Sequence, residues 1–195
     1  MQELTSAEEL MINQYAASEL AGAVIMGRMS RKTADPYLRR KFAWHCAEEA
    51  RHAVVWYDLI ERLDIHSMDL HDKEGYFSLI ERAESVVEFL AFVHVYELRV
   101  PFHFAVHMEW TQHPEIRRVL QGLIREESAH IEWIRGYLQR HPGRADVEAA
   151  LKKFSEFESA AYARDLSKIP DERFIAMVRE KLPAFERLKH DQISL

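Results

Sequence analysis

Glu48-Glu49-Ala50-Arg51-His52 is the stretch that decides how this chain folds, because its pattern returns at Glu126-Glu127-Ser128-Ala129-His130. Each copy contains a Glu-x-x-His unit. Residues three positions apart lie on one face of a helix, so each unit can present a carboxylate and an imidazole to the same metal ion. The sequence therefore predicts two helices that each carry part of a metal site.

A single acid precedes each unit by 30 residues: Glu19 lies before Glu49, and Glu97 lies before Glu127. An offset of 78 residues maps Glu19 onto Glu97 and the first unit onto the second. Both acids fall in apolar stripes of helical spacing, where a solvated acid is not expected. We therefore interpret the chain as a repeat of two helix pairs with ionisable residues at matched positions.

Hydrophobic periodicity predicts an all-α fold without a sheet. The expected helices run from Ser6 to about Arg31, Asp35-Pro36 to about Leu63, about Tyr76 to Trp110, His113-Pro114 to His141, Asp146 to about Leu166, and Glu172 to Lys189. A polar link, His66 to Gly75, joins the second and third helices. We expect a metal-binding bundle over about 6–140 and a helical extension over about 145–190, within a single domain spanning 1–195.

Three local features refine these helices. Ser6 and Glu9 have the spacing of a capping box at the first helix. Pro101 cannot donate to the Glu97 carbonyl, so a kink or bulge is expected beside that acid. Pro183 is expected to bend the last helix.

The first apolar stripe is predicted to contain Ile12, Tyr15, Ala16, Leu20, Ala23 and Met26.

Composition excludes several classes of protein. Of the 195 residues, 48% are hydrophobic and 30% charged, and only 6 are glycine and 6 proline, which favours long helices in a globular protein. The net charge of −6 argues against a nucleic-acid partner. A single cysteine, Cys46, excludes a disulfide scaffold and a cysteine-based metal site within the chain. The N-terminus lacks signal-peptide features and no apolar run approaches about 18 residues, so we expect a cytoplasmic protein without a membrane partner.

Six ionisable groups are predicted to point into one core: Glu19, Glu49, His52, Glu97, Glu127 and His130. The alternative is that some are exposed and the apolar stripes are slightly misplaced. Burying a carboxylate without a partner costs several kcal/mol, so four in one core require cations. Two divalent ions balance four carboxylates, and imidazoles bind as neutral ligands. A single Glu from each of two helices with Glu-x-x-His from two others is the ligand set of dinuclear sites in four-helix bundles.

On these residues the chain resembles the ferritin-like di-iron carboxylate superfamily over roughly residues 8–140. The resemblance implies a ferritin-like four-helix bundle with a long connection between the second and third helices, followed by one or two C-terminal helices. It also implies that Glu49 and Glu127 bridge the metals. Glu19 with His52, and Glu97 with His130, would then complete the two ends.

The motif is specific for the superfamily but is weak evidence for any one enzyme within it. Storage ferritins normally lack the second histidine, so His130 argues against simple iron storage. Classical rubrerythrins carry a cysteine-rich iron domain, which a single cysteine cannot form, so an isolated rubrerythrin-like domain stays open. Glu48-Glu49-x-Arg51-His52 is also similar to the signature of bacterial multicomponent monooxygenases and ribonucleotide reductases. By that resemblance Glu48 and Glu126 accept hydrogen bonds from the histidine N–H groups. The alternative is that both are solvated acids on the helix surface, without such a role.

Further side chains near the six predicted ligands are candidates for metal binding or for electron or hydrogen-bond donation. His94 and His45 each lie one turn before a proposed ligand and are candidate additional ligands, as an added histidine is in arylamine N-oxygenases. His94 is the better candidate, because rubrerythrins place an extra acid there; the alternative for both is a core histidine. Trp56 occupies the place of a redox tyrosine in the reductase family, and Tyr15 is positioned to donate a hydrogen bond or an electron, but both also suit core packing. The remaining histidines, including His103 and His107, are expected to face solvent or a partner.

The function implied is that of a non-haem oxidoreductase that activates O2 or H2O2 at two iron ions, with manganese or a mixed pair as alternatives. Electrons would come from an external donor, and the substrate would be a small apolar or aromatic molecule. A rubrerythrin-like peroxide scavenger, a ferroxidase or metal-storage protein, and a structural bundle with a degenerate site are the alternatives. We expect a homo-oligomer, as a dimer.

Overall fold

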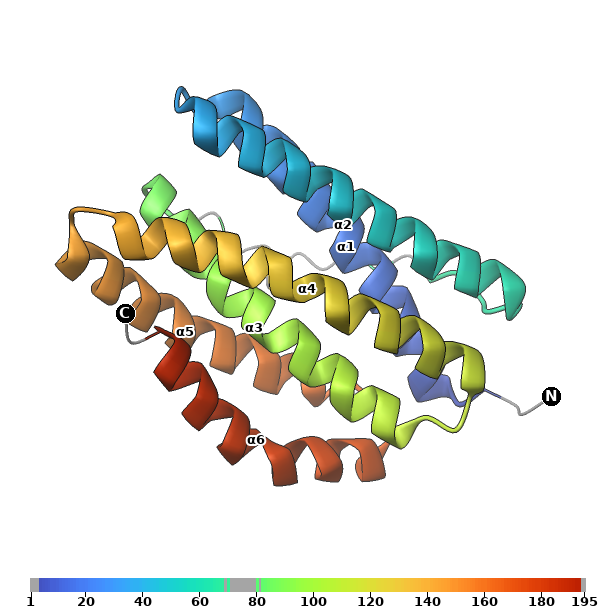
Figure 1. The fold of residues 1–195 in the computed structure, drawn as a ribbon. Helices are drawn as coiled ribbons and strands as arrows, with labels where there is room; N and C mark the ends of the chain where they lie inside the picture. Colours follow the sequence, from blue (N-terminus) through green and yellow to red (C-terminus); the bar gives the residue numbers. More distant parts are fainter. Residues whose placement is uncertain (1–3, 69, 71–79, 81, 194–195) are drawn as a thin grey trace. The chain divides into compact units, whose positions relative to one another are not determined.

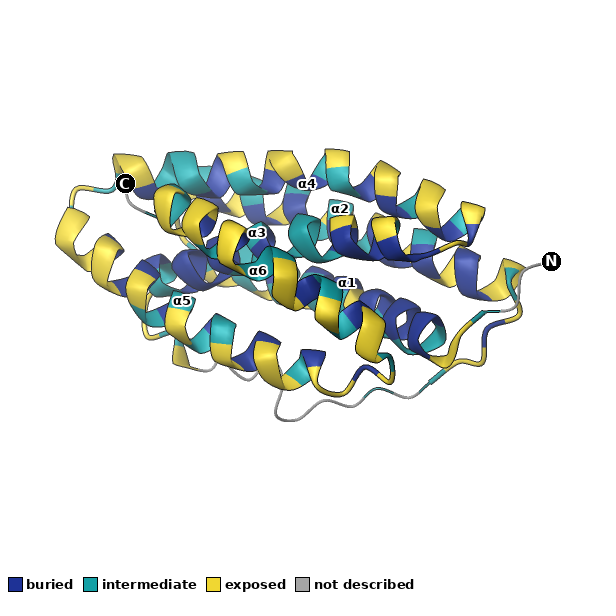
Figure 2. Cartoon of the chain, turned by 90° about the horizontal axis from the view of Figure 1, so that it is seen from below, coloured by how far each residue is buried: buried dark blue, intermediate teal, exposed yellow. Residues whose placement is uncertain are grey.

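The computed structural model describes residues 4–68, 70, 80 and 82–193 (Figure 1). The helices are α1 (Ser6–Lys32), α2 (Pro36–Arg62), α3 (Val86–Trp110), α4 (Pro114–Arg140), α5 (Arg144–Leu166) and α6 (Glu172–Ile193). No residue in these described ranges lies in a strand, so the all-α prediction is confirmed. Figure 2 shows the buried positions as bands that recur along the helices, with exposed positions between them.

The chain forms two compact units. The first unit comprises Met1–His71 and His113–Val119, and the second comprises Asp72–Gln112 and Leu120–Leu195. The first therefore contains α1 and α2, and the second contains α3, α5, α6 and most of α4. The single domain over 1–195 stays a prediction.

In the first unit, α1 and α2 begin at side-chain caps. Asp35 caps α2 by accepting from the backbone N–H of Tyr37 at 2.8 Å, with Pro36 in the first turn, as predicted. The capping box predicted at Ser6 and Glu9 is wrong by one residue: Thr5 caps α1, and its backbone N–H donates to Glu8. The sequence offers both boxes, and only the backbone geometry selects the earlier one.

The apolar stripe predicted for α1 is confirmed except at one position. Leu20 was expected in the core but is 46% exposed, whereas the other members of the stripe are buried. Leu20 directly follows Glu19, and a turn of 100° separates neighbours on a helix. The buried acid and its apolar neighbour therefore cannot both occupy the centre of the same narrow face.

The connection after α2 is anchored to α1. Asn13, which is buried, donates to the carbonyl of His66 at 3.1 Å and accepts from the backbone N–H of Met68 at 2.9 Å. The predicted start of the third helix at Tyr76 lies outside the described residues. α3 begins at Val86, where Ser85 accepts from the backbone N–H of Glu88. Residues 83–85, which the prediction placed inside the third helix, therefore precede α3.

In the second unit, α3 is the central helix. Val86–Trp110 is long and apolar enough to cross a membrane by length and composition alone, but 61% of that window is buried, as in the core helix of a globular protein. α3 contacts both α5 and α6. Its α-helical backbone is continuous through Pro101, so the proline causes no break. α6 changes direction near its middle, where Pro183 lies, as predicted (Figure 1).

Four charged side chains connect α3, α5 and α6, and the sequence analysis missed them. Arg99 donates to both carboxylate oxygens of Glu158 at 2.7 and 3.0 Å, and to Glu186 at 2.6 Å. Lys189 donates to Glu158 at 2.9 Å and pairs with Glu186 at 2.9 Å. Arg99, Glu158 and Lys189 are buried. The two positive and two negative charges balance, so this buried ion network holds the C-terminal helices against α3.

Two α3 histidines lie in the same region, and their predicted exposure is wrong. His107 is fully buried, and the rings of His103 and His107 lie 5.4 and 6.1 Å from that of Phe174. Burial lowers the pKa of each histidine to about 3. His103 is therefore neutral, and its Nδ1 shares a hydrogen bond of 2.8 Å with the hydroxyl of Tyr162. The C-terminal helices cover the face of α3 that was expected to meet solvent.

The buried neutral His107 predicts acid sensitivity. The unfolded chain binds a proton at this histidine near pH 6.5, but the folded chain does not until about pH 3. The free energy of unfolding therefore falls as the pH drops below 6.5, by roughly 2 kcal/mol per such histidine by pH 5. We expect His107→Asn to lessen this fall when urea unfolding is compared at pH 7.5 and pH 5. His190→Asn, at a side chain that is 77% exposed, should leave it unchanged; equal pH dependence in both variants would contradict the assignment.

Candidate metal centre

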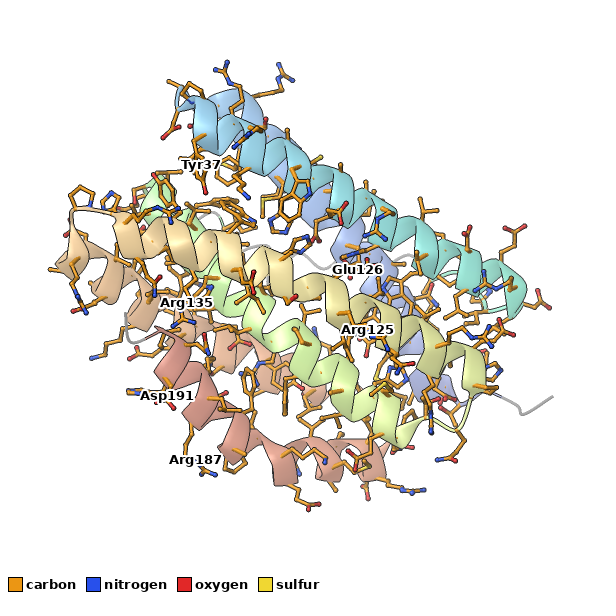
Figure 3. The ribbon with its side chains drawn as sticks, in the orientation of Figure 1. Tyr37, Arg125, Glu126, Arg135, Arg187 and Asp191 are labelled. Atoms are coloured by element: carbon orange, nitrogen blue, oxygen red, sulfur yellow. The ribbon has the colours of Figure 1, made fainter. Side chains whose placement is uncertain are left out.

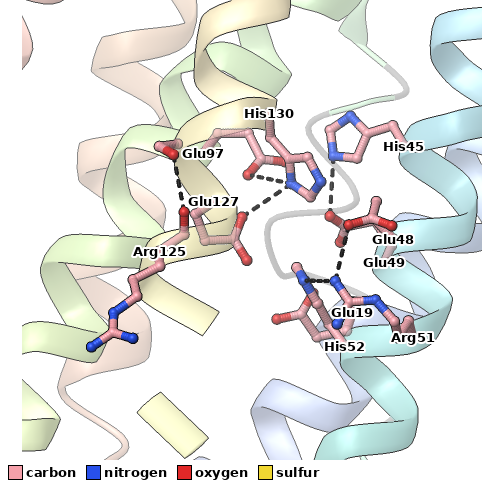
Figure 4. A network of polar contacts seen from close by, with 11 residues as sticks. Glu19, His45, Glu48, Glu49, Arg51, His52, Glu97, Arg125, Glu127 and His130 are labelled. Carbon is pink, nitrogen blue, oxygen red and sulfur yellow. Dashed lines mark hydrogen bonds and ion pairs between the residues drawn. The ribbon is translucent and has the colours of Figure 1, made fainter. Parts of the chain in front are cut away.

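Glu19, Glu49 and His52 form the first triad, on α1 and α2. All three are buried, at 7%, 6% and 0% exposure. Their ligand atoms lie within 4.8 Å of one another, and His52 Nδ1 is 3.5 Å from Glu19 Oε2 (Figure 4). The helical spacing of Glu49 and His52 turns both side chains toward α1, as the sequence predicted. Two carboxylates and one imidazole in this space can hold a metal ion.

Gly22 makes room for the first triad. A Cβ atom at this glycine would lie only 2.7 Å from Glu49 Oε2. Glycine inside a helix costs about 1 kcal/mol relative to alanine, so its presence here points to a packing requirement. The sequence analysis missed this residue, although an isolated glycine one turn after Glu19 was a visible indication.

His45 contacts the first triad directly. It is fully buried, and its Nε2 donates to Glu49 Oε1 at 3.0 Å (Figure 4). Arg51 lies on the other side of His52: its Nη2 is 3.4 Å from His52 Nε2 and donates to Glu48 at 2.9 Å. The side chain of Glu48 is 30% exposed. Glu48, which was predicted to accept from His52, therefore pairs with Arg51.

Glu97, Glu127 and His130 form the second triad, on α3 and α4. Their exposures are 3%, 1% and 1%. His130 Nδ1 donates to Glu127 Oε2 at 3.1 Å and lies 3.6 Å from Glu97 Oε2. Burial opposes a charge on His130, but the hydrogen bonds with Glu127 and Glu97 outweigh it and raise the pKa of the imidazole to about 11. A proton on His130 thus balances part of the negative charge that a metal cation would otherwise balance.

One distance recurs in the two triads. The distance from the histidine Nδ1 to the single acid is 3.5 Å in the first triad and 3.6 Å in the second. The 78-residue repeat in the sequence is therefore also a repeat in three dimensions. The partner of the bridging acid differs: His45 holds Glu49, whereas His130 holds Glu127.

His94, the favoured extra ligand, has other neighbours. It is fully buried, and burial lowers its pKa to about 4, while the backbone of Gln192 acts to raise it. Arg135, labelled on α4 in Figure 3, donates to the side chain of Gln192 at 2.9 Å. Among the described residues, His94 belongs to no group of three ligand atoms within 4.8 Å. These contacts tie His94 to the C-terminal end of α6.

The remaining candidates lie at the edges of the triads. Glu126, also labelled in Figure 3, is half-buried on α4. The rings of Tyr15 and Trp56 are 4.9 Å apart, and both side chains are buried. That pair packs in the core of the first unit, which agrees with the alternative considered for both residues. Their predicted redox role stays a prediction.

The donor atoms fit a hard divalent cation. Ligands bound at about 2.1 Å are about 3.0 Å apart at a right angle and about 3.6 Å apart at 120°. The contacts of 3.1, 3.5 and 3.6 Å within the triads, and of 3.0 Å between His45 and Glu49, span this interval. Carboxylate oxygen with imidazole nitrogen suits iron or manganese. The first triad therefore has the chemistry and spacing of a metal-binding site, and the second triad has the same donor atoms around His130.

Comparison with known proteins agrees with this chemistry. The family model for rubrerythrin matches residues 13–138, which include every member of both triads. No curated protein and no solved structure matches the chain. Rubrerythrin is a ferritin-like di-iron family, so the ferritin-like resemblance drawn from the sequence is confirmed.

Proposed function

The chain belongs to the rubrerythrin family, and from that premise we propose that it is a dinuclear metal oxidoreductase that activates O2 or peroxide. The first and second triads together bind the metal pair, with Glu49 and Glu127 as the bridging carboxylates. The observation that carries the proposal is the matched geometry of the triads, 3.5 and 3.6 Å between histidine and single acid. Burying two carboxylates and a histidine costs free energy, and a purely structural role gives no reason for both helix pairs to bury these groups.

The residues of the chain orient and isolate the site. Glu19 and Glu97 each add a carboxylate at one end, and His52 and His130 bind through Nδ1. Burial of all six side chains at 7% or less keeps bulk water away from the ligands. When bound, a pair of Fe(II) ions supplies the two electrons that reduce H2O2 to water. Iron is the metal that the family implies, with manganese or a mixed pair as alternatives.

The partners follow from this chemistry. Each turnover consumes electrons, so the protein requires an external electron donor. We propose a cytoplasmic setting and a dimeric assembly. A small apolar or aromatic substrate is required only if the reaction is an oxygenation. A peroxide scavenger requires none, and the rubrerythrin match favours that second function.

The test is anaerobic loading of the metal-free chain with Fe(II), followed by H2O2 or O2 in separate experiments. The loss of each oxidant and the conversion of Fe(II) to Fe(III) are measured over time. Fast peroxide consumption with a slow O2 reaction identifies a scavenger, and the reverse identifies an oxygenase or oxidase. Glu61→Gln, an exposed position on α2, is the matched control for ligand variants. Oxidant loss no faster than with free Fe(II) contradicts the proposal.

A further inference from the structure

The two triads have matched ligands but unmatched surroundings. The 78-residue offset maps His45 onto Leu123, so the second triad has no histidine at that position. Both side chains are buried, at 0% for His45 and 3% for Leu123. The exchange of leucine for histidine thus leaves Glu127 without a counterpart of His45, and the hydrogen-bond partner of Glu127 is His130 instead.

We propose that His45 is a metal ligand of the first triad, so that the two metal positions are chemically unequal. The proposal rests on the proposed function, because it assigns a seventh protein ligand to that same site. His45 Nε2 lies 3.0 Å from Glu49 Oε1, which is the separation of two ligands at a right angle around a cation with bonds of about 2.1 Å. A metal bound to both atoms takes the place of the proton that now joins them.

The first helix pair is built to hold His45 in this position. His45 and Glu49 lie four residues apart on α2, so their side chains share one face of that helix. Gly22 of α1 leaves space for the Glu49 carboxylate, and a Cβ there would be 2.7 Å from its Oε2. Glu49 is therefore fixed between Gly22 and His45. Its Oε1 faces the imidazole, so both atoms point to the same place before a metal arrives.

The added nitrogen makes the first position the stronger one. With His45, the first helix pair brings two carboxylates and two imidazoles, whereas the second triad brings two carboxylates and one imidazole. We infer that the first position fills before the second. Removing a partner outside the ligand shell already costs about 10- to 100-fold in metal affinity, so losing a ligand should weaken the first binding step by at least about tenfold.

The test counts histidine ligands in the Co(II)-loaded protein by proton NMR. Each histidine bound through one ring nitrogen carries a proton on the other, and this N–H gives a strongly shifted signal that disappears in D2O. Wild-type protein should show three such signals, from His45, His52 and His130. Those of His45 and His52 should appear with the first equivalent of Co(II).

Two variants separate ligation from positioning. His45→Leu, which copies Leu123, should show two signals and bind the first ion at least about tenfold more weakly. His45→Gln keeps a donor for Glu49 and should also show two signals with weakened binding. Wild-type affinity in His45→Gln, or only two signals in a wild-type protein that binds two Co(II) ions, would overturn the assignment of His45 alone. A wild-type protein that binds no Co(II) would overturn this assignment and the proposed function together.

Discussion

Replacing Glu158 with glutamine should lower the free energy of unfolding by about 3–5 kcal/mol. Glu158 is fully buried and accepts from Arg99 at 2.7 and 3.0 Å and from Lys189 at 2.9 Å. Glutamine keeps the size of the side chain but leaves two buried cations with one carboxylate, the partly exposed Glu186, in this network, beside the hydroxyl of Ser159 that accepts from Lys189. Urea unfolding of the metal-free protein measures the loss.

A control on the same helix separates burial from charge. Glu148 pairs with Arg144, and both side chains are more than half exposed, so Glu148→Gln should change stability by less than about 1 kcal/mol. If Glu158→Gln does not fold, Glu158→Gln with Lys189→Met removes one uncompensated cation and should restore part of the stability. A loss below about 1 kcal/mol in Glu158→Gln would show that the buried ion network does not hold α5 and α6 against α3.

Replacing Glu49 with glutamine should separate stability from metal binding. Glu49 and Glu19 are buried carboxylates of the same triad, so neutralising one removes a charge that costs free energy when no metal is bound. The metal-free variant should be at least as stable as the metal-free wild type. Its metal affinity should fall by more than about 100-fold, because a bridging ligand is lost.

Thermal unfolding with and without metal measures both effects. At a free metal concentration of about 100 times Kd, binding adds about 2.7 kcal/mol to the stability of the wild type, and the variant should gain almost none. Glu61→Gln, exposed on the same helix, should behave as wild type. A variant that loses stability without metal yet keeps the metal-dependent gain would show that Glu49 is a structural residue.

The repeat is the part of the fold that sequence predicts best. The ligand triads repeat at 78 residues, and a carboxylate has few reasons to lie in an apolar stripe. Burial of all six ligands confirms that inference. The ends of α2, α4 and α5 also agree with prediction within about two residues. The start of α3 differed because Ser85 and Glu88 give a local cap that periodicity does not detect.

The contacts of the C-terminal helices could not be predicted in the same way. Arg99 is the single Lys or Arg between Val86 and Trp110, which was an indication of a buried charge. Its partners, Glu158 and Glu186, lie 59 and 87 residues away, and no periodic pattern links them. His107 was assigned to the surface for the same reason: the aromatic residues that cover it come from a distant helix.

The sequence also could not show which of the two extra histidines contacts a triad. His94 and His45 were equivalent by spacing, and family resemblance favoured His94. The structure places His94 near Gln192 and Arg135, and His45 against Glu49. Spacing along a helix defines a face, but the direction of a ring within that face depends on the neighbouring helix. The single-domain organisation, the dimer and the electron donor stay predictions.

The most direct test of the metal pair is electron paramagnetic resonance of the metal-free chain saturated with Mn(II), combined with metal analysis. The proposed site predicts two Mn(II) ions per chain and the spectrum of an exchange-coupled pair, because in that proposal Glu49 and Glu127 bridge the ions. Glu127→Gln should lose the coupled spectrum. Two ions with the spectrum of isolated Mn(II), or less than about one ion per two chains, would contradict the account.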